Sequence, residues 1–337
     1  MSNLWKLKTI APFVALSLVA AGLAIAATIA HYSRNSAHPV AIPVSEFSLK
    51  GSGVQNLENQ WVVGADRADE LLAAGATLID ARPRRSQRLR PVPGAIPVSW
   101  KEFSQPKQPW RGKLLEDDLL LTEKLQAIGV FQEVPVLVFG DTAKGWGEEG
   151  RIVWMLRSLG HKKAVIIDGG DRVGRASRLT AIAPIQATNK ATSPPKRGDF
   201  LVKRVGNWQI GREELRASLA KNNLVIIDAR EKREYFGKTP YGESRGGRIP
   251  GAIHLYYKEL LAKNGLLLSR EEIVAKLEQK GITPTTEIAI YCTGGVRSAW
   301  LTSVLADLGY KAKNYPGSMW EWSAGSPLSY PLEKGKV

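Results

Sequence analysis

The feature that most constrains how this chain folds is an internal repeat, because one sequence pattern occurs twice within 337 residues. In each copy a tryptophan precedes a helical stretch, and an apolar strand ending in Asp-Ala-Arg then leads to a Pro-Gly-Ala-Ile turn. The first copy contains Trp61, Asp80-Ala-Arg82 and Pro93-Gly-Ala-Ile96, and the second contains Trp208, Asp228-Ala-Arg230 and Pro250-Gly-Ala-Ile253. A repeated unit with its parts in the same order predicts two similar domains.

The later part of each copy alternates helices with strands. Helical stretches at 117–128 and 270–280 precede short apolar strands at 136–139 and 288–291, and helices at 152–159 and 299–308 follow after a Gly-containing loop. This alternation predicts an α/β fold in which each domain has a mainly parallel sheet flanked by helices. We expect the domains at 58–184 and 206–332, joined by a linker at 185–205 that is polar and contains Pro194 and Pro195.

Cys292 is the only cysteine in the sequence, and it follows an apolar strand expected at 287–291. A helix is expected from Ser298 to Leu308, so the residues from Cys292 to Ser298 form a strand-to-helix turn. A loop that enters a helix directs backbone N–H groups and the positive end of the helix dipole at its interior. With Arg297 in the same loop, this environment favours a reactive thiolate over a thiol. The alternative is a buried structural cysteine.

Several motifs carry a resemblance to a known family. Cys292-Thr-Gly-Gly-Val-Arg-Ser298 resembles the active-site loop of the rhodanese sulfurtransferases. Asp228-Ala-Arg230 and Arg248-Ile-Pro-Gly-Ala-Ile253 resemble the family's first strand and its following turn, and Trp320-Glu-Trp322 resembles an aromatic signature of tandem-domain members. The loop is one residue shorter than the Cys-x5-Arg loop of cysteine phosphatases, which remain an alternative.

The resemblance implies two rhodanese-like domains after an amino-terminal hydrophobic segment, and a ping-pong transfer of sulfane sulfur. Cys292 would be the catalytic nucleophile, and the first copy, which has Gly140 at the corresponding position, would be catalytically silent. The expected partners are a small anionic sulfur donor and a thiophilic acceptor. The residues expected to bind the donor or cradle the sulfur are Arg230, Thr293, Gly294, Gly295, Val296, Arg297 and Ser298.

Some of these residues have simpler interpretations. Arg230 could be a surface arginine paired with Glu231 or Glu234, and Ser298 could cap the following helix. Asp228 is expected to be structural. Trp320 and Trp322 are expected to pack in the core or the cleft wall rather than to take part in chemistry.

The nature of the donor is a separate question. A cation at Arg297 favours thiosulfate, a compact dianion, over 3-mercaptopyruvate, whose specific enzymes resemble this loop less closely. A different class of function is a sulfane-sulfur carrier or binding module that serves a partner protein. The four histidines, at positions 31, 38, 161 and 254, lack metal-ligand spacing, so no metal and no cofactor is expected.

The amino terminus predicts export. Two lysines within Met1 to Lys8 precede an uncharged apolar run at 9–30, and a polar flank extends to His38. Residues 1–38 therefore read as a signal peptide or as a membrane anchor. Lysines ahead of the segment favour an extracytoplasmic, periplasmic location for the folded part, either exported or anchored to the inner membrane.

The net charge of +15 attracts anions in general, but the sequence has no nucleic-acid-binding motif, so nucleic acid is not an expected partner. The densest basic cluster contains Arg82, Arg84, Arg85, Arg88 and Arg90. It could be a solvated basic loop, or it could dock to an acidic partner or to lipid headgroups.

Overall fold

The computed structural model describes residues 57–170, 196–221 and 224–335 of the chain. The predicted signal or anchor segment at 1–38 lies outside the described residues, as does the first part of the predicted linker. The described residues belong to one compact unit. Among them, no helix combines the length and the hydropathy that crossing a bilayer requires.

The first sheet has five parallel strands in the order β1-β5-β4-β2-β3. Its strands are β1 (Val62–Val63), β2 (Thr77–Asp80), β3 (Ile96–Pro97), β4 (Val136–Phe139) and β5 (Ala164–Ile167). The central strand β4 and its neighbour β5 are buried throughout, which explains why their sequences are continuously apolar rather than alternating.

The second sheet repeats this topology with four parallel strands in the order β7-β6-β8-β9. Its strands are β6 (Val225–Asp228), β7 (Ile253–His254), β8 (Glu287–Tyr291) and β9 (Lys311–Asn314). A single parallel bridge between Gln209 and Asn314 stands where β1 pairs in the first sheet. The matching strand orders confirm the predicted fold class, with two α/β domains of the same topology.

Helices follow the strands in the same order in both copies. The first copy contains α2 (Ala65–Ala73), α3 (Arg84–Leu89), α4 (Asp118–Ala127), α5 (Glu148–Ser158) and a 3-10 turn at Trp100–Phe103. The second contains α9 (Arg212–Lys221), α10 (Lys232–Tyr235), α11 (Arg270–Glu278), α12 (Arg297–Asp307), α13 (Ser318–Ala324) and 3-10 turns at Gly206–Trp208 and Tyr257–Leu260.

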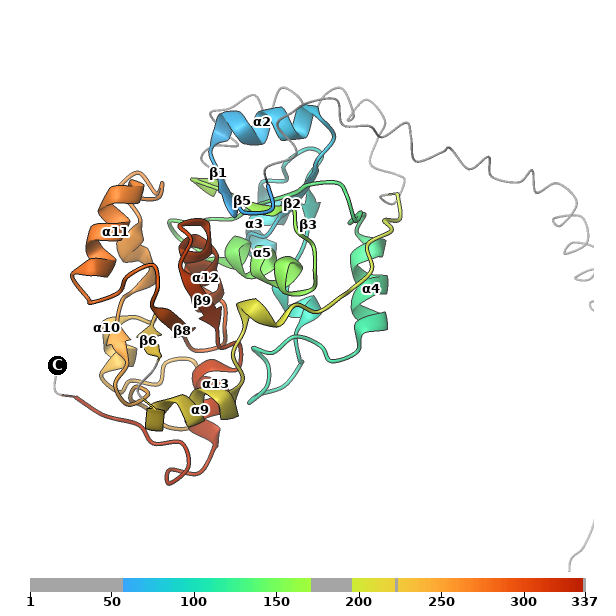
Figure 1. Ribbon diagram of the computed structural model, residues 1–337. Helices are drawn as coiled ribbons and strands as arrows, with labels where there is room; N and C mark the ends of the chain where they lie inside the picture. The colour runs from blue at the N-terminus through green and yellow to red at the C-terminus, as the bar shows by residue number, and fades with distance from the viewer. Residues whose placement is uncertain (1–56, 171–195, 222–223, 336–337) are drawn as a thin grey trace, which may run out of the picture. The chain divides into compact units, whose positions relative to one another are not determined.

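Helices α5 and α12 lie side by side and join the two copies (Figure 1). Each packs on the strands of its own sheet, and both are buried along nearly their whole length. A Cβ atom at Gly150 would lie 2.4 Å from the Cα atom of Trp300, so only glycine permits this close approach. Because each helix directly follows the loop at the end of a central strand, this contact also brings the two loops together.

The described part of the predicted linker runs along the first copy. The N–H groups of Phe200, Lys203 and Val205 donate to the carbonyl groups of Val130, Leu159 and Ser158. The side chain of Phe200 is fully buried. Residues 198–205 therefore add to the first domain, while the boundary of the linker remains a prediction.

The basic cluster differs from the expected loop. Residues 84–89 form helix α3, and Arg82 is buried, with its guanidinium bound to the carboxylate of Asp80 at 2.6 Å. Arg84 pairs with Glu102 at 3.0 Å. The prediction that Arg82 offers charge to a partner or lipid was therefore wrong, because Asp80 neutralises it inside the domain. Docking through the remaining arginines stays a prediction.

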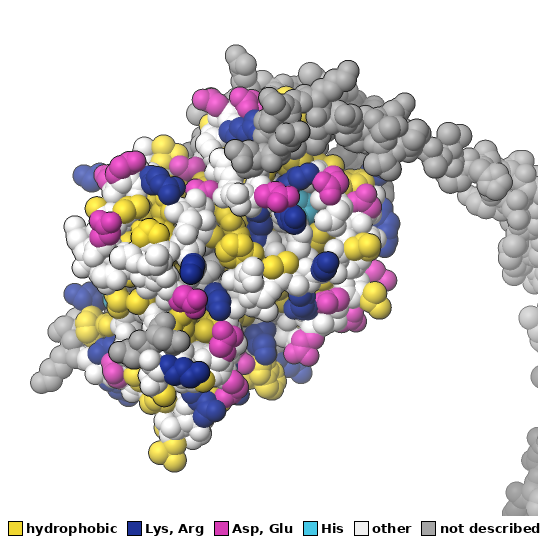
Figure 2. Space-filling model, in the orientation of Figure 1, with side chains coloured by type: hydrophobic (Ala, Val, Ile, Leu, Met, Phe, Trp, Pro, Cys, Tyr) yellow, Lys and Arg dark blue, Asp and Glu magenta, His cyan; other side chains and the backbone are white. Residues whose placement is uncertain are grey.

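The excess of positive charge is not gathered into one patch on the visible face of the molecule. Figure 2 shows Lys and Arg side chains interspersed with Asp and Glu side chains over this face. Where positive and negative side chains are close neighbours, their electrostatic fields partly cancel away from the protein surface.

Candidate active site

The Cys292 loop lies at the carboxyl end of β8, the edge at which parallel sheets of α/β proteins place their ligands. Helix α12 begins at Arg297, so the loop is shorter than expected, and Arg297 and Ser298 belong to the first helical turn. Val296, not Ser298, is the residue that precedes the helix. The Cys292 side chain is 1% exposed, and the strand before it is buried.

The sulfur atom of Cys292 accepts hydrogen bonds from its own loop. The N–H of Gly295 donates to Sγ at 3.1 Å, and the Ser298 hydroxyl donates to Sγ at 3.4 Å. Gly295 has φ of 75°, in the left-handed region that favours glycine, and this conformation turns its N–H towards the sulfur. The loop therefore binds the sulfur through a backbone amide and a hydroxyl group.

The backbone of Cys292 is also fixed from a neighbouring element. Its N–H donates to the Ser318 hydroxyl at 3.1 Å, and its carbonyl accepts from the N–H of Met319 at 3.1 Å. The next carbonyl, that of Thr293, accepts from the N–H of Trp320. The start of α13 thus holds the loop in place, which explains why the Trp320 and Trp322 region accompanies the cysteine motif in the sequence.

The environment of Cys292 lowers the pKa of its thiol. Burial raises this pKa, but the positive charge of Arg297 lowers it. Hydrogen bonds from the Ser298 hydroxyl and from backbone N–H groups, including that of Gly294, lower it further. The net shift is below the ordinary value, so the loop favours the thiolate, the reactive form of cysteine.

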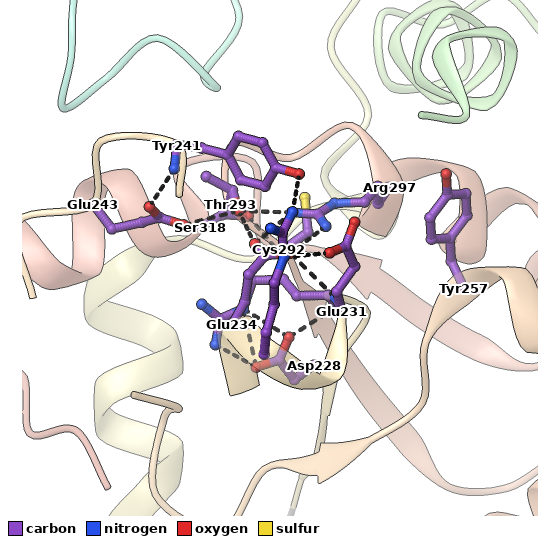
Figure 3. Close-up of polar contacts among 12 residues, drawn as sticks. Asp228, Glu231, Glu234, Tyr241, Glu243, Tyr257, Cys292, Thr293, Arg297 and Ser318 are labelled. Atoms are coloured by element: carbon purple, nitrogen blue, oxygen red, sulfur yellow. Dashed lines mark hydrogen bonds and ion pairs between the residues drawn. The ribbon is translucent and has the colours of Figure 1, made fainter. Parts of the chain in front are cut away.

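Arg297 is paired rather than free (Figure 3). Its guanidinium donates to both carboxylate oxygens of Glu234, at 2.7 and 2.8 Å, and to the Thr293 hydroxyl at 2.6 Å. Both members of this ion pair are buried. Burial lowers the pKa of Arg297, but Glu234 and the Cys292 thiolate raise it further, to a net value above the ordinary one. Sequence reasoning predicted the cation but missed its carboxylate partner.

Two aromatic rings cover Arg297. The guanidinium carbon lies 5.3 Å from the ring centroid of Trp146, in the first copy, and 5.6 Å from that of Tyr241, in the second. The two rings meet edge to face at 4.6 Å. Because Trp146 is 39% exposed, this pair forms an outer wall of the site and places the first copy next to the loop.

Thr293 links two acidic side chains, of which the sequence suggested only Glu234, and then as a partner of Arg230 rather than of this loop. Its hydroxyl oxygen lies 2.7 Å from a carboxylate oxygen of Glu234 and 3.2 Å from one of Glu243. Glu234 comes from α10 and Glu243 from the Gly-rich segment after it. No local pattern marks either residue, since only the fold brings them to the loop.

Arg230 does not join this group in the described structure. Its side chain is fully buried and binds Asp228, with its Nη2 atom 2.6 Å from the carboxylate, and it also donates to the Gly247 carbonyl at 2.7 Å. The partner is Asp228 rather than Glu231 or Glu234. Asp228 also accepts from the Arg230 N–H and from the Tyr291 hydroxyl, as expected of a structural residue. This arrangement lends no support to a contact between Arg230 and a donor.

The remaining predicted residues shape the loop. Gly294 passes under Trp320, since a Cβ atom there would lie 2.1 Å from the indole ring. Val296 is buried at the start of α12. Trp320 donates from its indole N–H to the Tyr241 carbonyl at 2.9 Å, while Trp322 packs in the core. Both tryptophans therefore serve packing, as predicted.

The counterpart loop of the first copy has a different chemistry. It runs from Gly140 to Gly147, and a carboxylate of Glu149 points back at Gly140. Its backbone contacts the second copy, because the Tyr257 hydroxyl donates to the Gly145 carbonyl at 2.8 Å and Lys258 donates to the Ala143 carbonyl at 2.9 Å.

Within the described residues no group of three or more His, Cys, Asp or Glu side chains is arranged to hold a metal ion.

Comparison with known proteins identifies the family. The family model of the rhodanese-like domain matches residues 211–325, which contain the Cys292 loop. The thiosulfate sulfurtransferase of Pseudomonas aeruginosa is 30% identical over 273 residues, covering 80% of this chain and 95% of that protein. The thiosulfate sulfurtransferase of Azotobacter vinelandii is 29% identical over 273 residues with the same coverage.

A solved structure shows the same fold. The Tum1 protein from Saccharomyces cerevisiae superposes with a TM-score of 0.68 over 83% of this chain and 99% of that protein, at 16% identity. The protein described here belongs to the rhodanese family and is a tandem-domain sulfurtransferase enzyme.

Proposed function

We propose that the protein transfers sulfane sulfur from thiosulfate to a thiophilic acceptor through a persulfide on Cys292. The observation that carries this proposal is the Cys292 sulfur itself, which is held by the Gly295 N–H and the Ser298 hydroxyl beside the charge of Arg297. Hydrogen-bond donors fixed around a sulfur atom stabilise both a thiolate and a persulfide anion.

The chemistry proceeds in two displacement steps. The Cys292 thiolate attacks the outer sulfur of thiosulfate, a new S–S bond forms, and the bond to the inner sulfur breaks, so that sulfite leaves with the electron pair. The acceptor then attacks the outer sulfur of the persulfide and the thiolate leaves. With cyanide as acceptor the product is thiocyanate, and both steps conserve charge without an added oxidant or reductant.

Thiosulfate is favoured as the donor by charge. Arg297 is offset by Glu234, but a further cation, Arg111 of the first copy, lies 6.0 Å from the ring of Trp320, which itself covers Gly294. Positive side chains near the loop attract a compact dianion. The relatives named thiosulfate sulfurtransferase support the same donor.

Steady-state kinetics test this proposal. Purified protein is assayed for thiocyanate from thiosulfate and cyanide, with Cys292→Ser as the control, and for pyruvate from 3-mercaptopyruvate. Continuous turnover of thiosulfate by the wild type alone is the expected result. Turnover of 3-mercaptopyruvate but not thiosulfate would contradict the donor, and a single loading without turnover would indicate a sulfur carrier instead.

We also propose that the enzyme acts outside the cytoplasm. Support comes from the uncharged run at 9–30 and the lysines before it. A membrane-impermeant thiol reagent should label Cys292, the only cysteine, in cells whose outer barrier is opened while the inner membrane stays intact. Labelling that requires lysis of the inner membrane would contradict this location, provided that the purified protein reacts with the same reagent.

A further inference from the structure

Arg151 lies near the start of α5, in the copy without a cysteine, and its side chain reaches the Cys292 loop. Its guanidinium donates to the Gly295 carbonyl at 3.3 Å. The same group donates to the Gly112 carbonyl at 2.6 Å and to the Ser104 hydroxyl at 3.1 Å. Arg151 therefore connects the first domain directly to the loop that holds the catalytic sulfur.

The charge of Arg151 has no carboxylate partner among the described residues, although Arg151 is only 1% exposed. Its guanidinium lies 4.6 Å from the ring centroid of Trp154 and 5.8 Å from that of Trp100. A buried cation without an opposite charge is costly and uncommon in proteins. Burial lowers the pKa of Arg151 to about 9, and the negative charge of Cys292 opposes this shift.

Arg151 and Arg297 differ in whether a carboxylate neutralises their charge. The charge of Arg297 is matched by Glu234, so that pair is neutral as a whole. The charge of Arg151 is matched only when Cys292 carries a negative charge, as a thiolate or as a persulfide. The balance of buried charge around the loop therefore favours an anionic sulfur.

Gly295 connects the side chain of Arg151 to that of Cys292. Its N–H donates to the Cys292 sulfur, and its carbonyl accepts from Arg151 and from the Asn314 amide, the latter at 3.3 Å. Since peptide units are planar and rigid, bonds at both ends of one residue fix how that residue turns. Arg151 thus acts on the sulfur by charge and by holding the amide that binds it.

We propose that Arg151 is a positioning residue of the transfer reaction, which fixes Gly295 and supplies from the first domain the buried positive charge that stabilises an anionic sulfur on Cys292. This inference rests on the persulfide function proposed above. It assigns the first domain, which has no nucleophile, a part in the reaction in addition to forming one side of the site.

The test is the titration of the Cys292 thiolate by its ultraviolet absorbance in the full-length protein. Because Cys292 is the only cysteine, subtraction of the Cys292→Ser titration isolates its signal. Arg151→Met should raise the thiolate pKa by roughly one unit, since it removes a buried charge near the sulfur. Arg151→Gln, which keeps an amide donor for the Gly112 carbonyl, should raise it as well, and Arg151→Lys, which keeps the cation, should restore most of the shift.

The matched control is Arg157, on the same helix. It too is a buried arginine that donates to backbone carbonyls, at Ala164 (3.0 Å) and Leu57 (2.8 Å), and its guanidinium lies 4.8 Å from the ring centroid of Trp61. Arg157→Met should destabilise the fold as Arg151→Met does, yet leave the thiolate pKa at the wild-type value. A purely structural role for Arg151 predicts the same titration for both variants.

Kinetics separate this inference from the function on which it rests. Below the wild-type thiolate pKa, Arg151→Met should lose about tenfold in kcat/KM for thiosulfate, and the loss should shrink as the pH rises through the raised pKa. An unshifted titration in Arg151→Met or Arg151→Gln, or an equal shift in Arg157→Met, overturns the inference while wild-type turnover still supports the proposed function. Failure of the wild type to use thiosulfate refutes that donor and leaves the titration as an independent test of Arg151.

Discussion

The carboxylate of Glu234 accepts hydrogen bonds from both Nη atoms of Arg297, at 2.7 and 2.8 Å. The rings of Trp146 and Tyr241 cover the same guanidinium group. The loop cation is therefore held in one orientation by a carboxylate from α10. Such a bidentate pair fixes geometry as well as charge. Arg297 is therefore already in place beside Cys292 before a donor binds, and from there it lowers the pKa of the Cys292 thiol.

Glu234→Gln should destabilise the protein at neutral pH by about 3 kcal/mol, because it leaves a buried arginine without its counter-charge. Burial raises the pKa of Glu234, but its bonds to Arg297 and Thr293 lower it further, to a net value below the usual 4.5. The stabilisation is thus present above pH 4.5 and is lost as the pH falls through the folded-state pKa.

Urea unfolding of the wild type and Glu234→Gln across this pH range measures the effect. The matched control is Glu133→Gln, whose partner is Lys163 at 2.7 Å and whose side chain is 79% exposed. That surface pair should contribute less than about 1 kcal/mol. Equal losses in both variants would contradict a special role for the buried pair.

Arg297→Ala should lower kcat/KM for the donor. The corresponding activation free energy should rise by about 1.5–3 kcal/mol, the scale of a hydrogen bond to a charged group. The substitution should also raise the pKa of Cys292, because it removes a nearby positive charge and leaves Glu234 unpaired. The double variant with Glu234→Gln should recover stability without recovering the donor efficiency of the wild type. Unchanged kinetics and an unchanged thiol titration in Arg297→Ala would show that this cation is not used.

Gly140→Cys should not create a second active site. A Cβ atom at this position would lie 1.9 Å from a carboxylate oxygen of Glu149, so the cysteine has no room without displacing that side chain. Above pH 7, where Glu149 is ionised, its charge also disfavours a thiolate. Mass spectrometry of Gly140→Cys combined with Cys292→Ser after thiosulfate treatment should show no added sulfur. Loading at position 140 would contradict this account of the silent loop.

Glu149→Gln should change how stability depends on pH. Burial raises the pKa of Glu149 from 4.5 to about 7, with the charge of Glu148 adding to the effect. The folded state thus holds a proton that the unfolded state has lost, so this stabilisation is full below pH 4.5 and is lost as the pH rises through about 7. The wild type should lose on the order of 3 kcal/mol across this window relative to Glu149→Gln. Parallel stability curves for the two proteins would contradict the shift.

The repeat and the strand sequences predicted the fold because both are local patterns. Strands β4 and β8 stood out as short apolar runs, and the matching motifs around Asp80 and Asp228 indicated two copies. Helix starts were less accurate: α5 begins at Glu148 and α12 at Arg297, because charged first-turn residues resemble loop in a sequence.

The site was predictable only where its residues are contiguous. Cys292, Gly295, Arg297 and Ser298 share one loop, so their proximity follows from the sequence. Glu234 and Arg151 reach the same loop from α10 and from the other copy, through packing that no spacing encodes. Arg230 is different, because its partner Asp228 lies two residues away and holds it inside the domain, so its predicted contact with a donor stays a prediction.

The central claim, that Cys292 carries sulfur between donor and acceptor, is tested most directly by the intact mass of the purified protein after thiosulfate treatment. The wild type should gain the mass of one sulfur atom, and cyanide should remove it. Cys292→Ser should gain nothing while keeping the wild-type fold by circular dichroism, since one sulfur-to-oxygen exchange opens no large cavity. Sulfur loading of Cys292→Ser, or a wild type that gains no mass from thiosulfate, would contradict the account.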